Sequence, residues 1–320
     1  MSAMLQIHGL VRHFGGVHAV DDVSFSVDRG QVLGFIGPNG AGKTTTMRIL
    51  ATLDTPQEGD ARIGGYSVVD DPEEVRRITG FMPDYAGVYA NTTVEEYLDF
   101  FARGHDLKGD DRRKAVAHII DFMGIGDLRD RHVESLSKGL KQRIALGRAI
   151  VHDPEVLILD EPAANLDPRA RIEFRALIRE LASDGKTILL SSHILTELSE
   201  MCDVITIIEK GRILANGTVQ DVLESVRKRR LLSVRVAGPA GPSAPGWHLD
   251  ALERFLLEQP GVTNVHEAGR CLQFEFDGGD HEQVQLVGRL VAAGVPVLEI
   301  SAHSAGLEDL FIEITKDRVQ

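Results

Sequence analysis

A glycine-rich segment directly behind an apolar run constrains this chain more than any other part of its sequence. The run is Val32-Leu33-Gly34-Phe35-Ile36, and the segment is Gly37-Pro38-Asn39-Gly40-Ala41-Gly42-Lys43-Thr44-Thr45, which fits the pattern G-x-x-x-x-G-K-[ST]. Glycines let the backbone curl until several N–H groups point at one phosphate, and a helix that follows adds its positive N-terminal dipole. The sequence therefore predicts a strand, a nucleotide-phosphate loop and a helix in succession.

Three side chains of this loop have expected roles at the phosphates. Lys43 is expected to grip the terminal phosphates, Thr44 to bind Mg²⁺ through its hydroxyl, and Thr45 to make a second phosphate contact. The alternative is an ordinary glycine-rich turn between a strand and a helix. Because glycines, a lysine and a hydroxyl all occupy the required positions, we favour the phosphate loop.

A second apolar run, Val156-Leu157-Ile158-Leu159, ends in Asp160-Glu161-Pro162. Such a run is typical of a buried parallel strand. An Asp at its carboxyl end would lie beside the phosphate loop and hold Mg²⁺, while Glu161 is placed to polarise an attacking water. Two acids after a strand can also form a plain turn, but the phosphate loop upstream favours the catalytic interpretation.

The segment Leu136-Ser137-Lys138-Gly139-Leu140-Lys141-Gln142-Arg143 resembles the signature sequence of the ATP-binding-cassette (ABC) family. In that family two cassettes dimerise head to tail, so the resemblance implies that Ser137, Lys138 and Gly139 contact ATP held by a second copy. The family usually has Gly and Gln where this chain has Lys138 and Leu140, so we expect a functional but altered site. The alternative is a helix N-terminus with an ordinary Ser cap.

Further positions match the family in the expected order. The resemblance implies that Asp167 crosses the dimer interface, that His193 contacts the γ-phosphate, and that Phe14 stacks on adenine with Val20 as an apolar edge. Taken alone, His193 could be a structural residue and Phe14 could pin a hairpin to the core.

Asp84 is the main departure from the family, which generally has Gln at this position. A carboxylate accepts hydrogen bonds but does not donate them, and it adds negative charge beside an anionic centre. We expect Asp84 to contact Mg²⁺ or the attacking water. The alternative is that it only shapes the loop.

The expected fold is α/β, with a parallel sheet of the phosphate-loop NTPase type, an antiparallel β subdomain, and a helical subdomain at about residues 85–152. Residues 1–226 would form this nucleotide-binding domain. Residues 227–320 follow a β-α-β-β-α-β order, which indicates a small ferredoxin-like α+β accessory domain. We also expect helices at 195–201 and 223–230, the latter ending in the charge run Arg227-Lys228-Arg229-Arg230. The segment 307–311 resembles the tail helix that closes cassettes of the drug- and polymer-exporter type.

Composition limits the partners and the location. The net charge of −13 argues against a nucleic-acid surface. The apolar runs are too short to span a bilayer, the first residues do not resemble a secretion leader, and Cys202 and Cys271 have no disulfide-like or zinc-like spacing. We expect a cytoplasmic protein that lies at the inner face of the membrane through its permease.

The resemblance implies an ATP-hydrolysing exporter subunit that uses ATP and Mg²⁺, dimerises with a second copy, and drives separate integral-membrane permease subunits. One alternative is a soluble member of the superfamily that acts on ribosomes or chromosomes, although the chain has a single phosphate loop and no sustained heptads. Another is an ATP-sensing regulatory partner with weakened hydrolysis. The sequence does not indicate the cargo.

Overall fold

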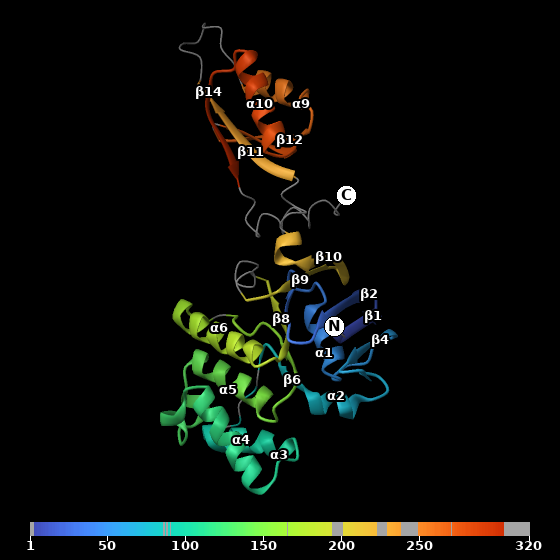
Figure 1. The fold of residues 1–320 in the computed structure, drawn as a ribbon, viewed down its shortest axis with the longest axis vertical. Helices are drawn as coiled ribbons and strands as arrows, with labels where there is room; N and C mark the ends of the chain where they lie inside the picture. The colour runs from blue at the N-terminus through green and yellow to red at the C-terminus, as the bar shows by residue number, and fades with distance from the viewer. Residues whose placement is uncertain are drawn as a thin grey trace. The chain divides into compact units, whose positions relative to one another are not determined.

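The computed structural model describes residues 3–85, 87, 89, 91–164, 166–193, 201–222, 229–237, 249–269 and 271–303. The chain divides into two compact units, Met1–Val219 and Gln220–Gln320. Figure 1 shows the first unit in blue to yellow and the second in orange to red. The expected boundary lay after residue 226, a few residues beyond this division.

The first unit is built on a six-stranded sheet with the order β10-β9-β3-β8-β7-β6. Its strands are β3 (Val32–Ile36), β6 (Thr79–Met82), β7 (Val156–Leu159), β8 (Thr187–Ser192), β9 (Val204–Glu209) and β10 (Arg212–Thr218). The ladders from β9 through β6 are parallel, which confirms the expected parallel sheet. Every residue of β3 and β7 is buried, as expected for strands covered on both faces.

The edge strand β10, which was not expected from the sequence, pairs antiparallel with β9. Its residues are exposed or half-buried, so it lacks the continuous apolar run by which the other strands of this sheet are recognised.

A second sheet of the first unit is antiparallel, with the order β2-β1-β4-β5. Its strands are β1 (Ala3–Phe14), β2 (Val17–Asp28), β4 (Glu58–Ile63) and β5 (Tyr66–Ser67). Residues of both sheets and of α1 (Lys43–Leu50) share one hydrophobic core, and α2 (Pro72–Ile78) contributes Val75 to it. The expected antiparallel subdomain is therefore confirmed, and it is joined to the nucleotide loop through this core.

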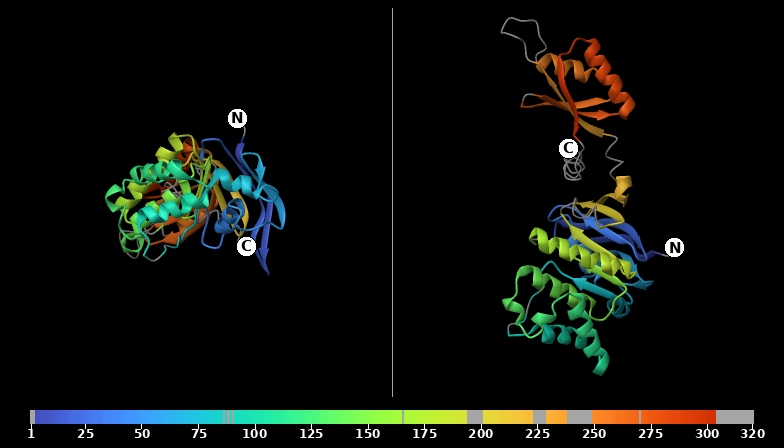
Figure 2. Two further views of the ribbon diagram at one scale, coloured as in Figure 1. Left: turned by 90° about the horizontal axis from the view of Figure 1, so that it is seen from below. Right: turned by 60° about the vertical axis from the view of Figure 1, so that its left-hand side comes forward.

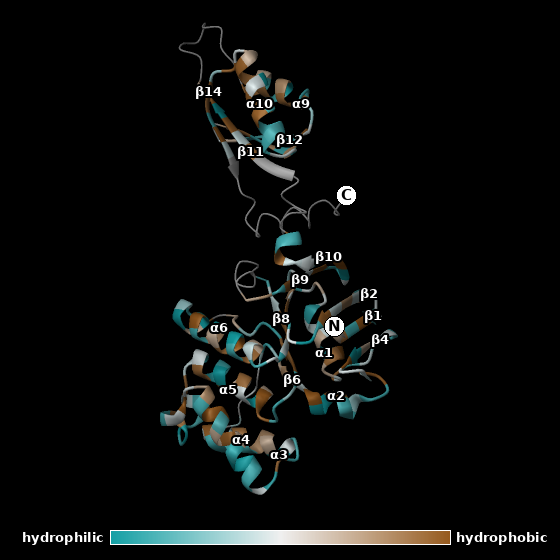
Figure 3. Ribbon diagram, viewed as in Figure 1, coloured by the Kyte–Doolittle hydropathy of each residue, from teal (hydrophilic) through white to brown (hydrophobic). Residues whose placement is uncertain are grey.

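Three helices form the expected helical subdomain: α3 (Val94–Gly104), α4 (Gly109–Phe122) and α5 (Lys138–Ile150). Two short 3-10 helices, Gly126–Leu128 and Val133–Ser135, lie between α4 and α5. The buried residues of α3 recur every three or four positions, and Figure 3 shows hydrophilic and hydrophobic residues side by side along these helices. A further helix, α6 (Pro168–Ser183), follows β7. None of the helices in the described part of the chain has the length and apolar character needed to span a membrane.

The second unit has the elements β11 (Arg229–Val236), α9 (Leu249–Leu257), β12 (Val262–Ala268), β13 (Cys271–Asp277), α10 (Asp280–Ala292) and β14 (Val297–His303). Its antiparallel sheet has the order β12-β13-β11-β14, and α9 and α10 share one core with it. Figure 2 shows both helices beside this sheet. The expected ferredoxin-like order is confirmed.

One expectation near the boundary is wrong: Arg229 and Arg230 begin strand β11 and do not end a helix. Their backbone pairs with Asp277 and Phe276 of β13, so the sheet of the second unit sets their conformation. The remainder of that expected helix, most of the one at 195–201, and the tail helix at 307–311 lie outside the described residues.

Candidate functional site

The phosphate loop connects β3 to α1 and requires glycine at two positions because other backbone comes close. A Cβ on Gly37 would lie 2.4 Å from the carbonyl oxygen of Ile208. A Cβ on Gly42 would lie 2.1 Å from the carbonyl oxygen of Ala19, and Gly42 also has a φ of 107°. The loop thus packs closely against both β9 and the β1–β2 hairpin. This packing fixes the position at which α1 begins.

Lys43 is buried at the first position of α1. Its Nζ donates to the carbonyl oxygens of Gly37 at 2.7 Å and Pro38 at 3.2 Å, and it lies 3.4 Å from Oε1 of Glu161. The ammonium group is therefore held at the mouth of the loop, beside the acid that the sequence predicts to be catalytic.

Asp160 is buried at the carboxyl end of β7, where its backbone N–H donates to the carbonyl of Met82 at the end of β6. Its Oδ1 accepts a hydrogen bond of 2.7 Å from the Ser191 hydroxyl. Burial raises the pKa of Asp160, and the charges of Glu161 and Asp84 raise it further, while hydrogen bonds from the Ser191 and Thr44 hydroxyls act in the opposite direction. Thr44, Asp84 and Asp160 thus lie in one electrostatic environment.

Glu161 occupies a strained position between these groups. Its φ of 47° is unusual for a residue other than glycine, and its backbone N–H donates to Ser191 Oγ at 2.7 Å. Oε2 lies 2.9 Å from Nδ1 of His193, whereas Oε1 is buried without a hydrogen-bond partner among the described residues. The side chain of Glu161 is 14% exposed and that of His193 is 48% exposed. The structure therefore brings an acid, an imidazole and a lysine together at the carboxyl ends of the parallel strands.

Ser137 and Asp167 each cap a helix. Ser137 is exposed before α5 and accepts from the backbone N–H of Leu140 at 3.4 Å, and Asp167 accepts from the N–H of Ala170 at 2.9 Å at the start of α6. Lys138 is exposed and Gly139 is half-buried beside Ala170. Capping is also what the ordinary-cap alternative predicts, so this geometry agrees with both interpretations.

Phe14 lies at the end of β1, and its side chain is 49% exposed, with the Arg12 guanidinium 4.6 Å above the ring centre. A ring this exposed does not pin the hairpin to the core. Val20 was expected to offer an apolar edge to the same ligand, but its side chain is 0% exposed and belongs to the core shared by both sheets. In this structure Val20 packs in the core, where it stabilises the hairpin, and it presents no surface to a base.

Two further residues connect the site, and neither was assigned a role from its sequence position. Ser191 bridges the Asp160 carboxylate and the Glu161 N–H, and Gln142 Nε2 donates to the Pro162 carbonyl at 2.7 Å, which ties α5 to the loop after β7. Ser191 lies in β8 two residues before His193, so its place beside that expected residue was the available signal.

The donors around the loop fit Mg²⁺ and nucleotide phosphates. The hydroxyl of Thr44 and the carboxylates of Asp160 and Asp84 are the oxygen ligands that Mg²⁺ prefers. The two glycines at which a Cβ would clash show a loop whose path is set by its backbone, as a phosphate cradle requires.

Comparison with known proteins agrees with this geometry. The sequence model of the family described as ABC transporter matches residues 20–164. The daunorubicin/doxorubicin resistance ATP-binding protein DrrA of Streptomyces peucetius is 33% identical over 97% of this chain and 92% of its own length. The Nod factor export ATP-binding protein I of Ralstonia nicotianae is 36% identical over 98% of this chain and 94% of its own length.

A solved structure of an ATP-binding subunit of an ABC transporter superposes with a TM-score of 0.64 at 31% identity, covering 70% of this chain and 93% of that one. These similarities show the family: the chain belongs to the ATP-binding proteins of ABC transporters. It is an ATPase subunit, and the nucleotide it binds is ATP.

Proposed function

We propose that this chain hydrolyses ATP at a composite, Mg²⁺-dependent site of a head-to-tail homodimer, and thereby drives separate permease subunits of an exporter. The observation that carries the proposal is the cluster of Lys43, Glu161 and His193 beside buried Asp160. The exporter assignment rests on relatives named for drug resistance and for Nod factor export. The cargo is left unassigned.

Glu161 is proposed to act as the general base. Its Oε2 is held by His193, and its Oε1 is buried 3.4 Å from the Lys43 ammonium without a hydrogen bond among the described residues. A carboxylate placed in this way can take a proton from, or orient, an attacking water. His193 would position Glu161 and reach the γ-phosphate from the other side of the ring.

Lys43 and the loop backbone are proposed to hold the phosphates. In the described structure the Nζ of Lys43 donates to two loop carbonyls, and the phosphates would take their place as acceptors. Thr44, Asp160 and Asp84 would hold Mg²⁺, which when bound offsets the negative charge of the phosphates. Thr45 would add a phosphate contact from the first turn of α1.

The other half of the site is proposed to come from a second copy of the chain. The first turn of α5 carries no acidic residue, and Ser137 and Lys138 are exposed there, so this helix end can accept an anion from outside its own subunit. Asp167 is exposed at the start of α6. A lone subunit should therefore bind ATP but hydrolyse it poorly.

The membrane partner is also part of the proposal. We place the chain at the cytoplasmic face of the membrane, attached to permease subunits. Affinity purification from detergent-solubilised membranes tests this: an integral membrane protein should copurify, and its absence in repeated preparations would favour the alternative of a soluble superfamily member.

The hydrolytic role is tested by ATPase measurements on purified Glu161→Gln protein. Loss of a general base costs roughly 10²–10⁴-fold in rate, whereas nucleotide binding should persist. Glu155→Gln is the matched control, because Glu155 lies at the opposite end of β7 and pairs with Arg29 on the surface. Hydrolysis at the wild-type rate in Glu161→Gln would refute the assigned role.

A further inference from the structure

The β1–β2 hairpin carries two histidines directly opposite each other. The register of the hairpin pairs Phe14 with Val17 and His13 with His18, around the turn Gly15-Gly16. Directly opposed residues of an antiparallel pair point to the same face and lie close together. The two imidazoles are thus neighbours by strand register, and their ring centres are 3.8 Å apart.

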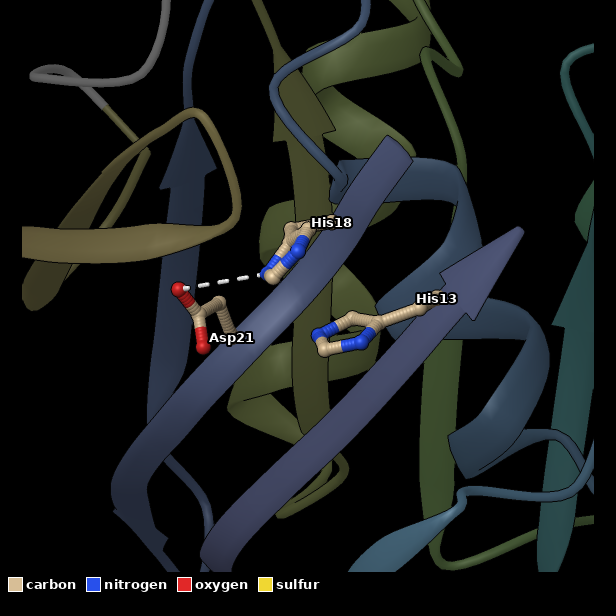
Figure 4. Close-up of side chains that lie close together, drawn as sticks. All are labelled: His13, His18 and Asp21. Atoms are coloured by element: carbon tan, nitrogen blue, oxygen red, sulfur yellow. Dashed lines mark ion pairs between the residues drawn. The ribbon is translucent and has the colours of Figure 1, made fainter. Parts of the chain in front are cut away.

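A β-bulge adds a carboxylate to the same face. In a regular strand, residues three apart point to opposite faces, which would separate His18 from Asp21. The register shifts between Arg12 and His13, so that Ala19 has no partner on β1 and the alternation is offset by one residue. Asp21 therefore lies beside His18, with Oδ2 3.9 Å from His18 Nδ1, as Figure 4 shows.

The three side chains form a compact set of nitrogen and oxygen donors. One potential ligand atom from each of His13, His18 and Asp21 lies within 4.8 Å of the others. Nε2 of His13 is buried and has no hydrogen-bond partner among the described residues. A buried polar atom without a partner is costly, so this nitrogen is available to a ligand from outside the described chain.

Arg212 also holds the Asp21 carboxylate, at the same oxygen that lies nearest to His18. Its Nε donates to Asp21 Oδ2 at 2.7 Å, and this hydrogen bond fixes the orientation of the carboxylate. Metal-bound carboxylates are commonly oriented by a second partner in this way. The guanidinium is a nearby positive charge, but its side chain is largely exposed, so water screens its repulsion of a cation.

We propose that His13, His18 and Asp21 form a binding site for a divalent transition-metal cation, of which Zn²⁺ is the representative. Two imidazoles and one carboxylate suit Zn²⁺, with a fourth position left to water or another ligand. Mg²⁺ and Ca²⁺ prefer oxygen donors and should bind here poorly. Small side-chain rotations must bring the three donors to metal-bond distances of about 2.0–2.2 Å. This site goes beyond the proposed function, because it shares no residue with the ATP and Mg²⁺ site.

The test is Zn²⁺ binding to the full-length, nucleotide-free protein in excess Mg²⁺, followed by calorimetry and by competition with a coloured chelator. Wild-type protein should bind one equivalent that the double variant His13→Gln/His18→Gln lacks. Asp21→Asn should weaken that equivalent by at least about tenfold. His8→Gln is the matched control, because His8 is exposed on the same strand β1 and should leave the equivalent intact. His193→Ala should also retain it, which separates this site from zinc held beside Glu161.

Co²⁺ provides a second readout that does not depend on counting equivalents. Bound to two imidazoles and a carboxylate in a near-tetrahedral site, it should produce visible absorption in wild-type and His8→Gln protein and not in the double variant. Thermal unfolding of each variant checks that it is folded. Equal Zn²⁺ stoichiometry and equal Co²⁺ spectra in wild type and a folded double variant would overturn the proposal.

Discussion

At the scale of single residues, the site combines charged side chains with a strained backbone at Glu161, the proposed general base. Glu161 has a left-handed backbone conformation, which costs on the order of 1–3 kcal/mol for a residue other than glycine. The bond from its N–H to Ser191 Oγ and the contact of its carboxylate with His193 hold it there. In this conformation the carboxylate lies 3.4 Å from Lys43 Nζ.

Asp160→Asn tests how much the buried charge of Asp160 destabilises the folded protein. A raised folded-state pKa means that the proton on Asp160 stabilises the fold at low pH, and that this stabilisation is lost as pH rises through the folded-state pKa. Its charge therefore destabilises the nucleotide-free protein at neutral pH. Asn should raise Tm by a few degrees there, with a smaller gain as pH falls toward 3.8, and should abolish most Mg²⁺-dependent hydrolysis. A lower Tm at neutral pH would contradict this account.

Asp84→Asn tests the departure from the usual Gln. The charge of Asp84 contributes to the raised pKa of Asp160, so removing it should move the acid limb of the pH–rate profile to lower pH. We expect the turnover number to change by more than the dissociation constant for ATP, measured side by side. Unchanged turnover and an unchanged pH profile would show that Asp84 only shapes its loop.

The cluster could be predicted largely from the sequence because its main members stand in ordered motifs. Lys43, Asp160, Glu161 and His193 were all expected residues, and the structure brings them together. Ser191 was missed because a serine at the end of a strand can cap, bind solvent or pack without any role in a site, so its identity alone does not indicate one. Val20 was misassigned because a sequence match does not show which face of a bulged hairpin a residue takes.

At the scale of elements, the connection between β3 and α1 depends on close backbone packing. In Gly37→Ala the new methyl group would lie 2.4 Å from the Ile208 carbonyl oxygen, so the loop or β9 must move. We expect a loss of about 1–3 kcal/mol in unfolding free energy and weaker ATP binding. Gly16→Ala, which has open space around its Cβ, should stay within about 0.5 kcal/mol of wild type. Equal effects of the two changes in urea unfolding would contradict the packing argument.

The junction of the helical subdomain with the sheet contains a pair of stacked histidines. His105 follows α3 and His152 follows α5, and their ring centres are 3.6 Å apart at an interplanar angle of 4°. They line a hollow of about 320 Å³ together with Phe101 and Arg148. His152 Nε2 lies 3.2 Å from the Thr79 carbonyl oxygen at the start of β6, so the pair connects both helices to the sheet.

This pair should make the first unit sensitive to acid. Burial, together with the neighbouring His105, lowers the pKa of His152 from 6.5 to about 4. Between pH 6.5 and pH 4 His152 is protonated in the unfolded chain but largely neutral in the folded chain. The free energy of unfolding is therefore highest above pH 6.5 and decreases as pH falls toward 4. The loss is no more than about 3–4 kcal/mol.

His152→Gln should reduce the slope of unfolding free energy against pH in this window. His118→Gln, which removes an exposed histidine from α4, should leave the slope as it is in the wild type. Denaturant unfolding at a series of pH values measures both. Identical slopes for wild type and His152→Gln would show that folding does not lower the pKa of His152.

Helices and strands with a clear hydrophobic pattern were predictable from the sequence. Elements whose conformation depends on pairing with a distant strand were not. The buried strands β3 and β7 and the amphipathic helix α3 follow from their apolar patterns. The edge strand β10 has a weak pattern and depends on β9 for its ladder. Arg229 and Arg230 look like a charged helix end, but pairing with β13 makes them strand.

At the scale of the whole molecule, we propose that one chain holds half of each ATP site. The phosphate loop, Asp160 and Glu161 lie at one edge of the parallel sheet, whereas Ser137 and Asp167 cap their own helices with exposed ends. Hydrolysis should consequently rise with protein concentration more steeply than first order until the dimer is saturated, because two copies must meet. A constant specific activity down to high dilution, with the protein shown to be monomeric, would oppose the composite site.

The most direct test is the solution mass of Glu161→Gln protein with Mg²⁺ and ATP, measured by light scattering after gel filtration. Without hydrolysis the ATP-bound state should persist, so the mass should be that of a dimer with ATP and of a monomer with ADP. Adding Ser137→Arg, which places a bulky side chain at the exposed end of α5, should return the protein to a monomer in ATP while it still binds nucleotide. A monomeric mass for Glu161→Gln at saturating ATP would contradict the account.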